Sequence, residues 1–312
     1  MSESILECSA LEKSYDGRKV VDGVGFTIGK GESYGLLGPN GAGKTTTISM
    51  ICGLLRRDGG QVTVAGNTLD TTSAQSKKAI GYVPQDIALY PDLSGKENLR
   101  FWGRLYGLSG KDLSNAVSQT LEIVGLSERA SDRVSEYSGG MKRRLNIAAG
   151  LLHKPKLLIL DEPTVGVDPQ SRNAILENVE ALNQQGMSVL YTSHYMEEVE
   201  RLCHRVGIID EGKLIAEGTR RELVHSIGQK DRIKIAATGD LDALARECKA
   251  MEQVAEATVA QEVHLIAADG RLLLPQIFAA AERTGVSIST VDVIEPDLEA
   301  VFLHLTGKAL RD

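Results

Sequence analysis

The residues best suited to chemistry form one continuous run, Gly38-Pro39-Asn40-Gly41-Ala42-Gly43-Lys44-Thr45-Thr46. The run fits the pattern G-x-x-x-x-G-K-[ST], in which glycines let the backbone wrap a phosphate chain and turn successive N–H groups toward it. Lys44 can reach the β- and γ-phosphates of a nucleotide, and the Thr45 hydroxyl can bind Mg²⁺. A helix beginning here would add the positive end of its dipole. The chain is therefore predicted to bind a nucleoside triphosphate.

A pair of acids supplies the second candidate for chemistry. The apolar run Leu157–Leu160 reads as a buried strand, and Asp161 and Glu162 follow it directly. Open α/β sheets bind ligands at the carboxyl ends of their strands. Asp161 is placed to hold Mg²⁺, directly or through water, whereas Glu162 can polarise an attacking water. The alternative is two exposed acids before a turn, and the phosphate loop upstream favours the catalytic interpretation.

Strands alternate with helices around both motifs, which predicts a largely parallel sheet. A strand at residues 34–37 precedes the phosphate loop and a helix at 46–51 follows it. Further strands are expected at 80–84, 188–192 and 205–209, with 213–216 after a turn, and helices at about 171–185 and 195–203. Residues 5–30 and 61–65 read as antiparallel strands. A helical series from Glu97 to Leu126, broken by glycines at 103, 107, 110 and 125, predicts a helical subdomain over about residues 86–150.

The motif-rich part ends near residue 228. We expect one domain at 1–228 and an accessory domain at 229–312, whose strand and helix order, βαββαβ, predicts a small ferredoxin-like fold. No chemistry is visible in this second domain. A structural or dimerising role is favoured there over ligand sensing.

Composition excludes several classes of protein. The 312 residues suggest two domains. A net charge of −7 and 4% aromatic residues argue against nucleic-acid binding, which needs a basic surface and stacking platforms. The four cysteines are widely spread and predict reduced thiols rather than a zinc site. The N-terminus does not resemble a signal peptide, and no apolar run approaches the length of about 20 residues that a membrane span needs.

A third motif, Tyr137-Ser138-Gly139-Gly140-Met141, opens a helix and offers a second anion-binding N-terminus. Together the motifs resemble the nucleotide-binding domain of ATP-binding cassette (ABC) transporters over about residues 5–225. This resemblance implies an α/β P-loop NTPase fold with a mainly parallel core sheet, an antiparallel β subdomain and a helical subdomain. It implies the following roles: Tyr15 stacks on adenine, Gly38–Thr46 is the Walker A loop, Gln85 contacts Mg²⁺, Ser138–Gly140 is the signature, Asp161 is the Walker B acid, Glu162 is the catalytic glutamate, Asp168 ends the D-loop, and His194 is the switch histidine.

Three positions depart from the family pattern. The signature usually begins with Leu and has Gln at its fifth position, where this chain has Tyr137 and Met141. Val165 replaces the small polar residue common at the start of the D-loop, which puts some coupling across a dimer in doubt. The phosphate-facing Ser138–Gly140 is intact, and both Glu162 and His194 are present. An active ATP hydrolase is therefore expected.

The family resemblance also implies partners. ATP with Mg²⁺ is expected between two such domains, so the chain should form a homodimer or pair with a paralogue. Asp92–Leu99 lies where the family receives a helix from an integral-membrane permease. The sequences of the signature, the D-loop and the C-terminal segment Glu295–Leu303 are most similar to those of type-2 exporters for drugs, lipo-oligosaccharides or sodium. The protein is expected to lie at the cytoplasmic face of the cell membrane. The alternatives are a non-transport ATPase acting on ribosomes or DNA, and an importer ATPase.

Overall fold

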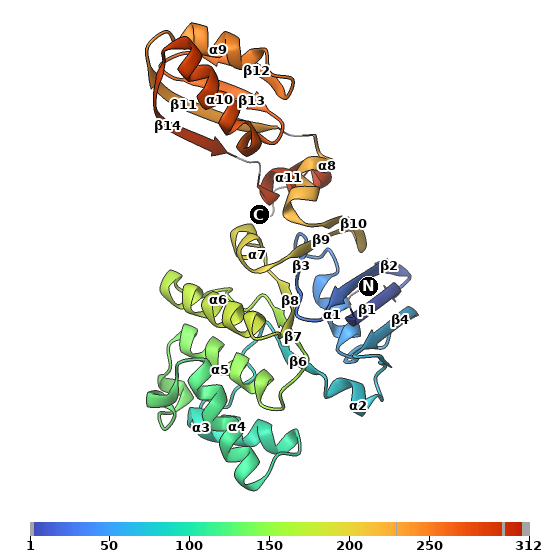
Figure 1. The fold of residues 1–312 in the computed structure, drawn as a ribbon. Coiled ribbons are helices and arrows are strands. Elements are labelled where there is room, and N and C mark those ends of the chain that lie inside the picture. Colours follow the sequence, from blue (N-terminus) through green and yellow to red (C-terminus); the bar gives the residue numbers. More distant parts are fainter. Residues whose placement is uncertain (1–2, 229, 295–296, 308–312) are drawn as a thin grey trace. The chain divides into compact units, whose positions relative to one another are not determined.

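The computed structural model describes residues 3–228, 230–294 and 297–307 (Figure 1). The chain divides into two compact units, Met1–Arg220 and Arg221–Gly307. The first unit ends where helix α8 (Arg220–Ser226) begins. The sequence predicts the boundary at residues 228–229, just past the end of that helix. Two residues of the C-terminal segment cited above, Glu295 and Pro296, lie outside the described residues. Among the described helices, none combines the length and the apolar character needed to cross a membrane.

The N-terminal strands form an antiparallel sheet in the order β2-β1-β4-β5. They are β1 (Ser4–Tyr15), β2 (Arg18–Gly29), β4 (Gly59–Val64) and β5 (Asn67–Thr68). The two long strands are joined at Asp16 and Gly17, which both have positive φ as a tight hairpin turn requires. This sheet confirms the antiparallel strands predicted for residues 5–30.

The central sheet has the order β10-β9-β3-β8-β7-β6, and only the β9–β10 pair is antiparallel. Its strands are β3 (Ser33–Leu37), β6 (Ile80–Val83), β7 (Leu157–Asp161), β8 (Ser188–Thr192), β9 (Arg205–Asp210) and β10 (Lys213–Gly218). Every residue of β3, β7 and β8 is buried, since elements cover both faces of a parallel sheet. The parallel run β3-β8-β7-β6 brings the carboxyl ends of four strands to one edge. The phosphate loop and the segments that carry Gln85, Glu162 and His194 begin at that edge.

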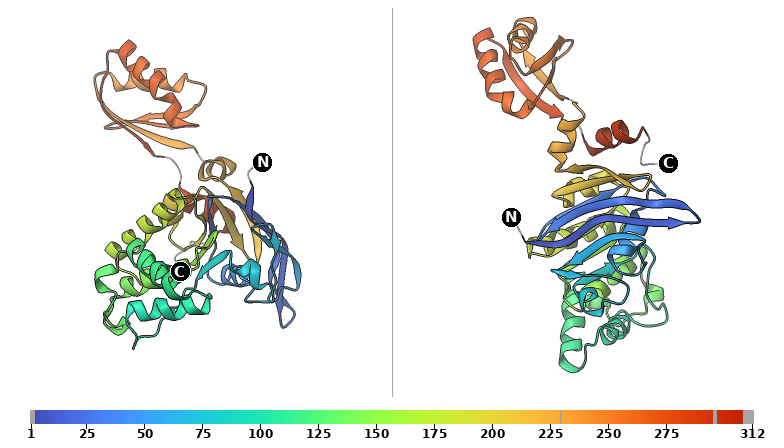
Figure 2. Two further views of the ribbon diagram at one scale, coloured as in Figure 1. Left: turned by 60° about the horizontal axis from the view of Figure 1, so that its bottom comes forward. Right: turned by 90° about the vertical axis from the view of Figure 1, so that its right-hand side faces the viewer.

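Helices pack on both faces of the central sheet (Figures 1 and 2). Helix α1 (Lys44–Ile51) lies toward the antiparallel sheet, whereas α5 (Gly139–Leu151), α6 (Pro169–Gln184) and α7 (Met196–Leu202) cover the other face. The first turn of α6 is stabilised by Pro169 and by Asp168, whose Oδ1 accepts a hydrogen bond from the Ser171 N–H at 2.9 Å.

The helical subdomain follows β6. It contains α3 (Gly95–Leu105), α4 (Gly110–Ile123), two short 3₁₀ turns (Ser127–Arg129 and Val134–Glu136) and α5, while the one-turn α2 (Ala74–Lys77) precedes β6. Ser94 and Glu97 form a reciprocal capping box at the start of α3. The prediction that Gly103 breaks the helix is wrong, because Gly103 lies inside α3. A Cβ there would come within 2.4 Å of Leu113 Cδ1, so this glycine lets α3 and α4 approach each other.

The second unit contains the order predicted for it. Its elements after α8 are β11 (Asp231–Thr238), α9 (Leu241–Lys249), β12 (Val254–Val259), β13 (Val263–Ala267), α10 (Gly270–Thr284), β14 (Ser287–Ile294) and α11 (Leu298–Thr306). The antiparallel sheet has the order β12-β13-β11-β14, which is the ferredoxin-like arrangement. Its core is separate from that of the first unit and includes Ile233, Leu244, Leu265 and Ile277. The predicted fold class is confirmed for both parts.

Candidate active site

The phosphate loop leaves β3 at Gly38 and enters α1 at Lys44. Two of its glycines are required by close approach: a Cβ on Gly38 would lie 2.4 Å from the Ile209 carbonyl oxygen, and one on Gly43 would lie 2.7 Å from that of Val20. Gly43 is the N-cap of α1 with φ of 102°, and no side chain caps the helix. The first N–H groups of α1 therefore remain available to an anion.

Lys44 is buried beside this loop, with 6% of its surface exposed. Its Nζ donates hydrogen bonds to the carbonyl oxygens of Gly38 at 2.7 Å and Pro39 at 3.2 Å. Burial lowers the pKa of Lys44, and the nearby Glu162 carboxylate opposes that shift. The ammonium is thus held over the loop that the sequence assigned to the phosphates.

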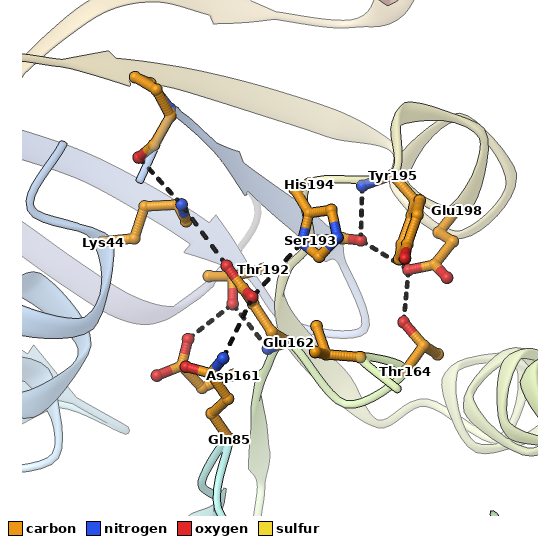
Figure 3. A network of polar contacts seen from close by, with 12 residues as sticks. Lys44, Gln85, Asp161, Glu162, Thr164, Thr192, Ser193, His194, Tyr195 and Glu198 are labelled. Atoms are coloured by element: carbon orange, nitrogen blue, oxygen red, sulfur yellow. Dashed lines mark hydrogen bonds and ion pairs between the residues drawn. The ribbon is translucent and has the colours of Figure 1, made fainter. Parts of the chain in front are cut away.

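Glu162 is the meeting point of three residues predicted from the sequence (Figure 3). Its Oε1 lies 3.5 Å from Lys44 Nζ, and its Oε2 lies 3.4 Å from His194 Nδ1 and 3.5 Å from Gln85 Nε2. Glu162 has φ of 47°, a left-handed conformation that is uncommon for a residue with a side chain. Its backbone N–H donates to Thr192 Oγ1 at 3.0 Å. The carboxylate is turned back toward α1, while Asp161 stays in the strand.

Asp161 ends β7 with 1% of its surface exposed. Its Oδ1 accepts a hydrogen bond from Thr192 Oγ1 at 2.8 Å, whereas its buried Oδ2 makes no hydrogen bond within the described chain. Burial raises the pKa of Asp161, and interactions with the Thr192 and Thr45 hydroxyls oppose the rise. A buried carboxylate oxygen without a partner, close to a second hydroxyl, fits a hard cation such as Mg²⁺.

The donor set also fits the way in which Mg²⁺ is usually held. Mg²⁺ is normally bound by one or two carboxylates together with substrate phosphates and water. The described residues contain no group of three or more His, Cys, Asp or Glu side chains placed to hold a metal by themselves. Asp161 and Thr45 therefore suit a cation that arrives with the nucleotide.

Replacing Asp161 with asparagine is expected to stabilise the nucleotide-free chain, although it removes the predicted metal ligand. Since burial raises the pKa of Asp161, the unfolded chain ionises first as pH rises, and the native state loses stability until Asp161 is also ionised. The neutral amide avoids this cost. We therefore expect a higher unfolding midpoint than that of the parent at neutral pH.

Calorimetry at several pH values measures this effect. The gain from Asp161→Asn should shrink as pH falls toward the ordinary carboxyl range. A midpoint equal to that of the parent at every pH would show that the Asp161 charge is compensated in the native state.

The other predicted site residues occupy distinct places. Tyr15 ends β1 with 47% of its surface exposed, and Lys13 Nζ lies over one face of its ring, 5.5 Å from the centroid. Ser138 is the N-cap of α5, where its Oγ accepts from the Met141 N–H at 3.2 Å. Asp168 caps α6 within this chain. Only the exposed part of its side chain would therefore be able to contact a nucleotide. None of these three lies in the contact group around Glu162.

The departure at Tyr137 has a structural reason. Tyr137 is buried, and its hydroxyl donates to the Arg129 carbonyl oxygen at 2.7 Å. A Cβ on Gly95 would come within 2.4 Å of that hydroxyl, so the missing side chain at Gly95 makes room for the ring. The larger residue at the signature start is accommodated inside the helical subdomain and leaves Ser138 exposed.

Sequence reasoning missed three residues that position the site. Thr192 lies directly opposite Asp161 in the β7–β8 register and bonds to both acids. Arg143 donates to the carbonyl oxygens of Gln85 and Val165, joining two loops. Glu198 lies buried behind His194. A signal existed for Thr192 alone, since it is a polar residue at the carboxyl end of a buried strand.

The geometry defines a P-loop ATPase, and the comparisons with known proteins agree. The family model described as "ABC transporter" matches residues 21–165. The chain is 48% identical over 311 residues to the linearmycin resistance ATP-binding protein LnrL of Bacillus subtilis, covering 99% of this chain and 100% of that protein. It is 38% identical over 315 residues to the Nod factor export ATP-binding protein I of Paraburkholderia xenovorans, covering 100% of both.

Solved structures give the same result. An ATP-binding subunit of an ABC transporter matches with a TM-score of 0.65 and 32% identity over 72% of this chain and 93% of that one. An ATP-binding cassette in its ADP conformation matches with a TM-score of 0.65 and 26% identity over 71% of this chain and 93% of that one. The chain therefore belongs to the ABC transporter family. It is the ATP-binding and ATP-hydrolysing subunit of an ABC exporter, so the resemblance in its motifs is confirmed.

Proposed function

We propose that the chain hydrolyses ATP with Mg²⁺ between two nucleotide-binding subunits and drives efflux through a separate membrane permease. Lys44 and the N–H groups of Gly38–Thr46 hold the phosphates, and Tyr15 stacks on adenine. Asp161, Thr45 and Gln85 hold Mg²⁺, which neutralises charge on the phosphate oxygens. Glu162 polarises the attacking water, and His194 contacts the γ-phosphate.

The observation that carries this proposal is the convergence on Glu162. Lys44, Gln85 and His194 come from three separate segments of the chain, yet each places a nitrogen within 3.5 Å of this one carboxylate. A carboxylate beside the phosphate-binding lysine is suited to orient and deprotonate a water. The histidine next to it is suited to report whether the γ-phosphate is present.

The placement of the signature supports a second copy. A Cβ on Gly140 would lie 2.1 Å from Ser171 Oγ, and one on Gly139 would lie 4.0 Å from the Gly166 carbonyl oxygen. The signature thus lies beside the D-loop and α6, whereas the phosphate loop leads into α1, which lies on the other face of the sheet (Figure 1). Ser138 and Gly139 are exposed. A head-to-tail homodimer, or a pair with a paralogue, would give each ATP one phosphate loop and one signature, with Asp168 facing the partner.

A hollow in the helical subdomain supports a permease. It is an open depression with a volume of about 450 Å³, lined by Asp92, Leu93, Ser94, Lys96, Glu97, Arg100, Ser131 and Arg133. It includes much of the segment Asp92–Leu99 that the family uses to receive a membrane-subunit helix. Both signs of charge line this hollow, so we propose that it accepts a polar cytoplasmic helix of the permease at the inner face of the membrane.

Copurification tests this proposal. Tagged chain is isolated from native membranes in mild detergent, and its companions are identified by mass spectrometry. A polytopic permease in stoichiometric amount is the expected result, lost when charges in the hollow are reversed by Arg100→Glu with Arg133→Glu. Recovery of the chain alone, or with ribosomes, would contradict the transport role.

A further inference from the structure

A buried carboxylate behind the switch histidine is not used by any role given above. Glu198, in α7, has 2% of its surface exposed. Its Oε2 accepts hydrogen bonds from three hydroxyls: Thr164 at 2.9 Å, Tyr191 at 2.9 Å and Ser193 at 2.6 Å (Figure 3). Its Oε1 lies 3.4 Å from Arg172 Nε. Burial, with the Glu198 charge adding to it, raises the pKa of Tyr191, so the phenol stays a donor.

The four partners of Glu198 come from segments on both sides of the active site. Thr164 lies between Glu162 and the D-loop, and Arg172 lies in the first turn of α6, just after it. Tyr191 and Ser193 flank Thr192, which bonds to both active-site acids. One carboxylate therefore joins the D-loop segment, the start of α6 and the end of β8.

His194 is held between two neighbours that depend on this carboxylate. Ser193 Oγ donates to Glu198 and accepts the N–H of Tyr195 at 2.9 Å. The Arg172 guanidinium lies 4.0 Å from the centroid of the Tyr195 ring, which itself lies 4.1 Å from the His194 ring centroid. The His194 imidazole thus packs on the Tyr195 ring, which Arg172 contacts. Ser193, the residue before His194, is hydrogen-bonded to Glu198 directly.

Stability alone does not account for a carboxylate at this position. A buried charge has a large desolvation cost, and well-packed apolar residues often stabilise a fold as well or better. Two neighbours on α7, Val199 and Leu202, are apolar and buried. A carboxylate also fixes the geometry around it, because each hydroxyl must lie in one place to donate a hydrogen bond to it.

We propose that Glu198 is a positioning residue for ATP hydrolysis: through Ser193, Arg172 and Tyr195 it holds His194 against Glu162, and through Thr164 it couples this arrangement to the D-loop. The inference rests on the roles of His194 and Glu162 proposed above. It predicts that loss of the carboxylate slows turnover without weakening nucleotide binding.

Steady-state hydrolysis by the purified full-length chain tests the inference. Misplacing a catalytic group by about 1 Å can cost about 10²-fold in rate. Glu198→Gln and Arg172→Met are each expected to lower kcat about 10- to 100-fold, with KM for ATP changed by less than about twofold. Ser193→Ala removes only one hydroxyl and is expected to fold even where Glu198→Gln does not. It should lower kcat about 3- to 10-fold.

Two matched controls separate positioning from general packing. Ser188→Ala removes a hydroxyl at the other end of β8, where it accepts from the Gly31 N–H. Arg201→Gln breaks a surface ion pair between α7 and α6, formed with Glu180 at 2.7 Å. Both should keep kcat within about twofold of the parent. If they lower kcat as much as Ser193→Ala and Arg172→Met do, the effect is packing and the inference is overturned.

A double variant with His194→Ala separates this inference from the proposed function. Rates are measured as single turnovers with labelled ATP, so that slow variants remain measurable. If Glu198 acts through His194, adding Ser193→Ala to His194→Ala should change the rate by less than about twofold. A full additive loss overturns the positioning role. A normal rate for His194→Ala alone would instead overturn the role of His194 and the inference that depends on it.

Discussion

Glu162→Gln is expected to stop hydrolysis while ATP remains bound. The amide keeps the shape of the side chain and an oxygen that can face Lys44, but it cannot take a proton from water. A positioned general base contributes about 10²–10⁴-fold to rate, so kcat should fall by at least about 10²-fold. In the proposed cycle ATP closes the pair and hydrolysis reopens it, so the variant should accumulate as an ATP-bound dimer.

Phosphate release and size-exclusion chromatography with Mg²⁺ and ATP measure these two effects. Glu180→Gln is the matched control, since Glu180 lies on α6 and pairs only with surface residues in the described contacts. It should hydrolyse ATP normally and elute as the parent does. Normal hydrolysis by Glu162→Gln would show that another group activates the water.

The sequence could predict the elements that carry a strong local signal. The strands β3 and β7 are short, mostly apolar and followed by turn residues, so the sequence predicts their positions to within a residue or two. The ferredoxin-like unit was predicted from alternating periods alone, because each of its strands and helices buries one face. In these places local propensity and tertiary packing agree.

The sequence could not predict features that depend on packing between distant segments. Gly103 resembles a helix breaker, yet its contact with Leu113 on the next helix decides its role. The left-handed φ of Glu162 has no sequence signal, since Glu rarely adopts it. Glu198, in a short helix with two other acids, resembles a solvated residue in the sequence. Its burial appears only when β8, α6 and the D-loop segment are brought together around it.

Roles assigned through the family resemblance depend on a different kind of information. Lys44, Glu162 and His194 meet in one chain, so the fold of a single copy supports them. Tyr15, Ser138 and Asp168 lie apart from that group. Their predicted roles can be tested only with nucleotide bound or with a second chain present. The two sets therefore need different experiments.

Ser138→Arg is expected to abolish turnover and leave ATP binding to the monomer intact. Ser138 is exposed at the start of α5, so an arginine can be accommodated within its own chain at the cost of one helix cap, about 1 kcal/mol. In a closed pair, the longer side chain would occupy the space of the partner's γ-phosphate. Hydrolysis should fall at least about 10²-fold, while equilibrium binding of a fluorescent ATP analogue stays within about twofold. Ser109→Arg, at the exposed N-cap of α4, is the matched control and should remain active.

Mixing two inactive variants then decides on which ATP Ser138 acts. Lys44→Ala disables a phosphate loop, and Ser138→Arg disables a signature. In a mixed head-to-tail pair, one site receives both lesions, and the other joins an intact phosphate loop to an intact signature. Mixing the two inactive proteins should therefore restore a measurable fraction of hydrolysis, rising with the share of mixed pairs. If Ser138 served the ATP of its own chain, every site in the mixture would carry one lesion and the mixture would stay inactive.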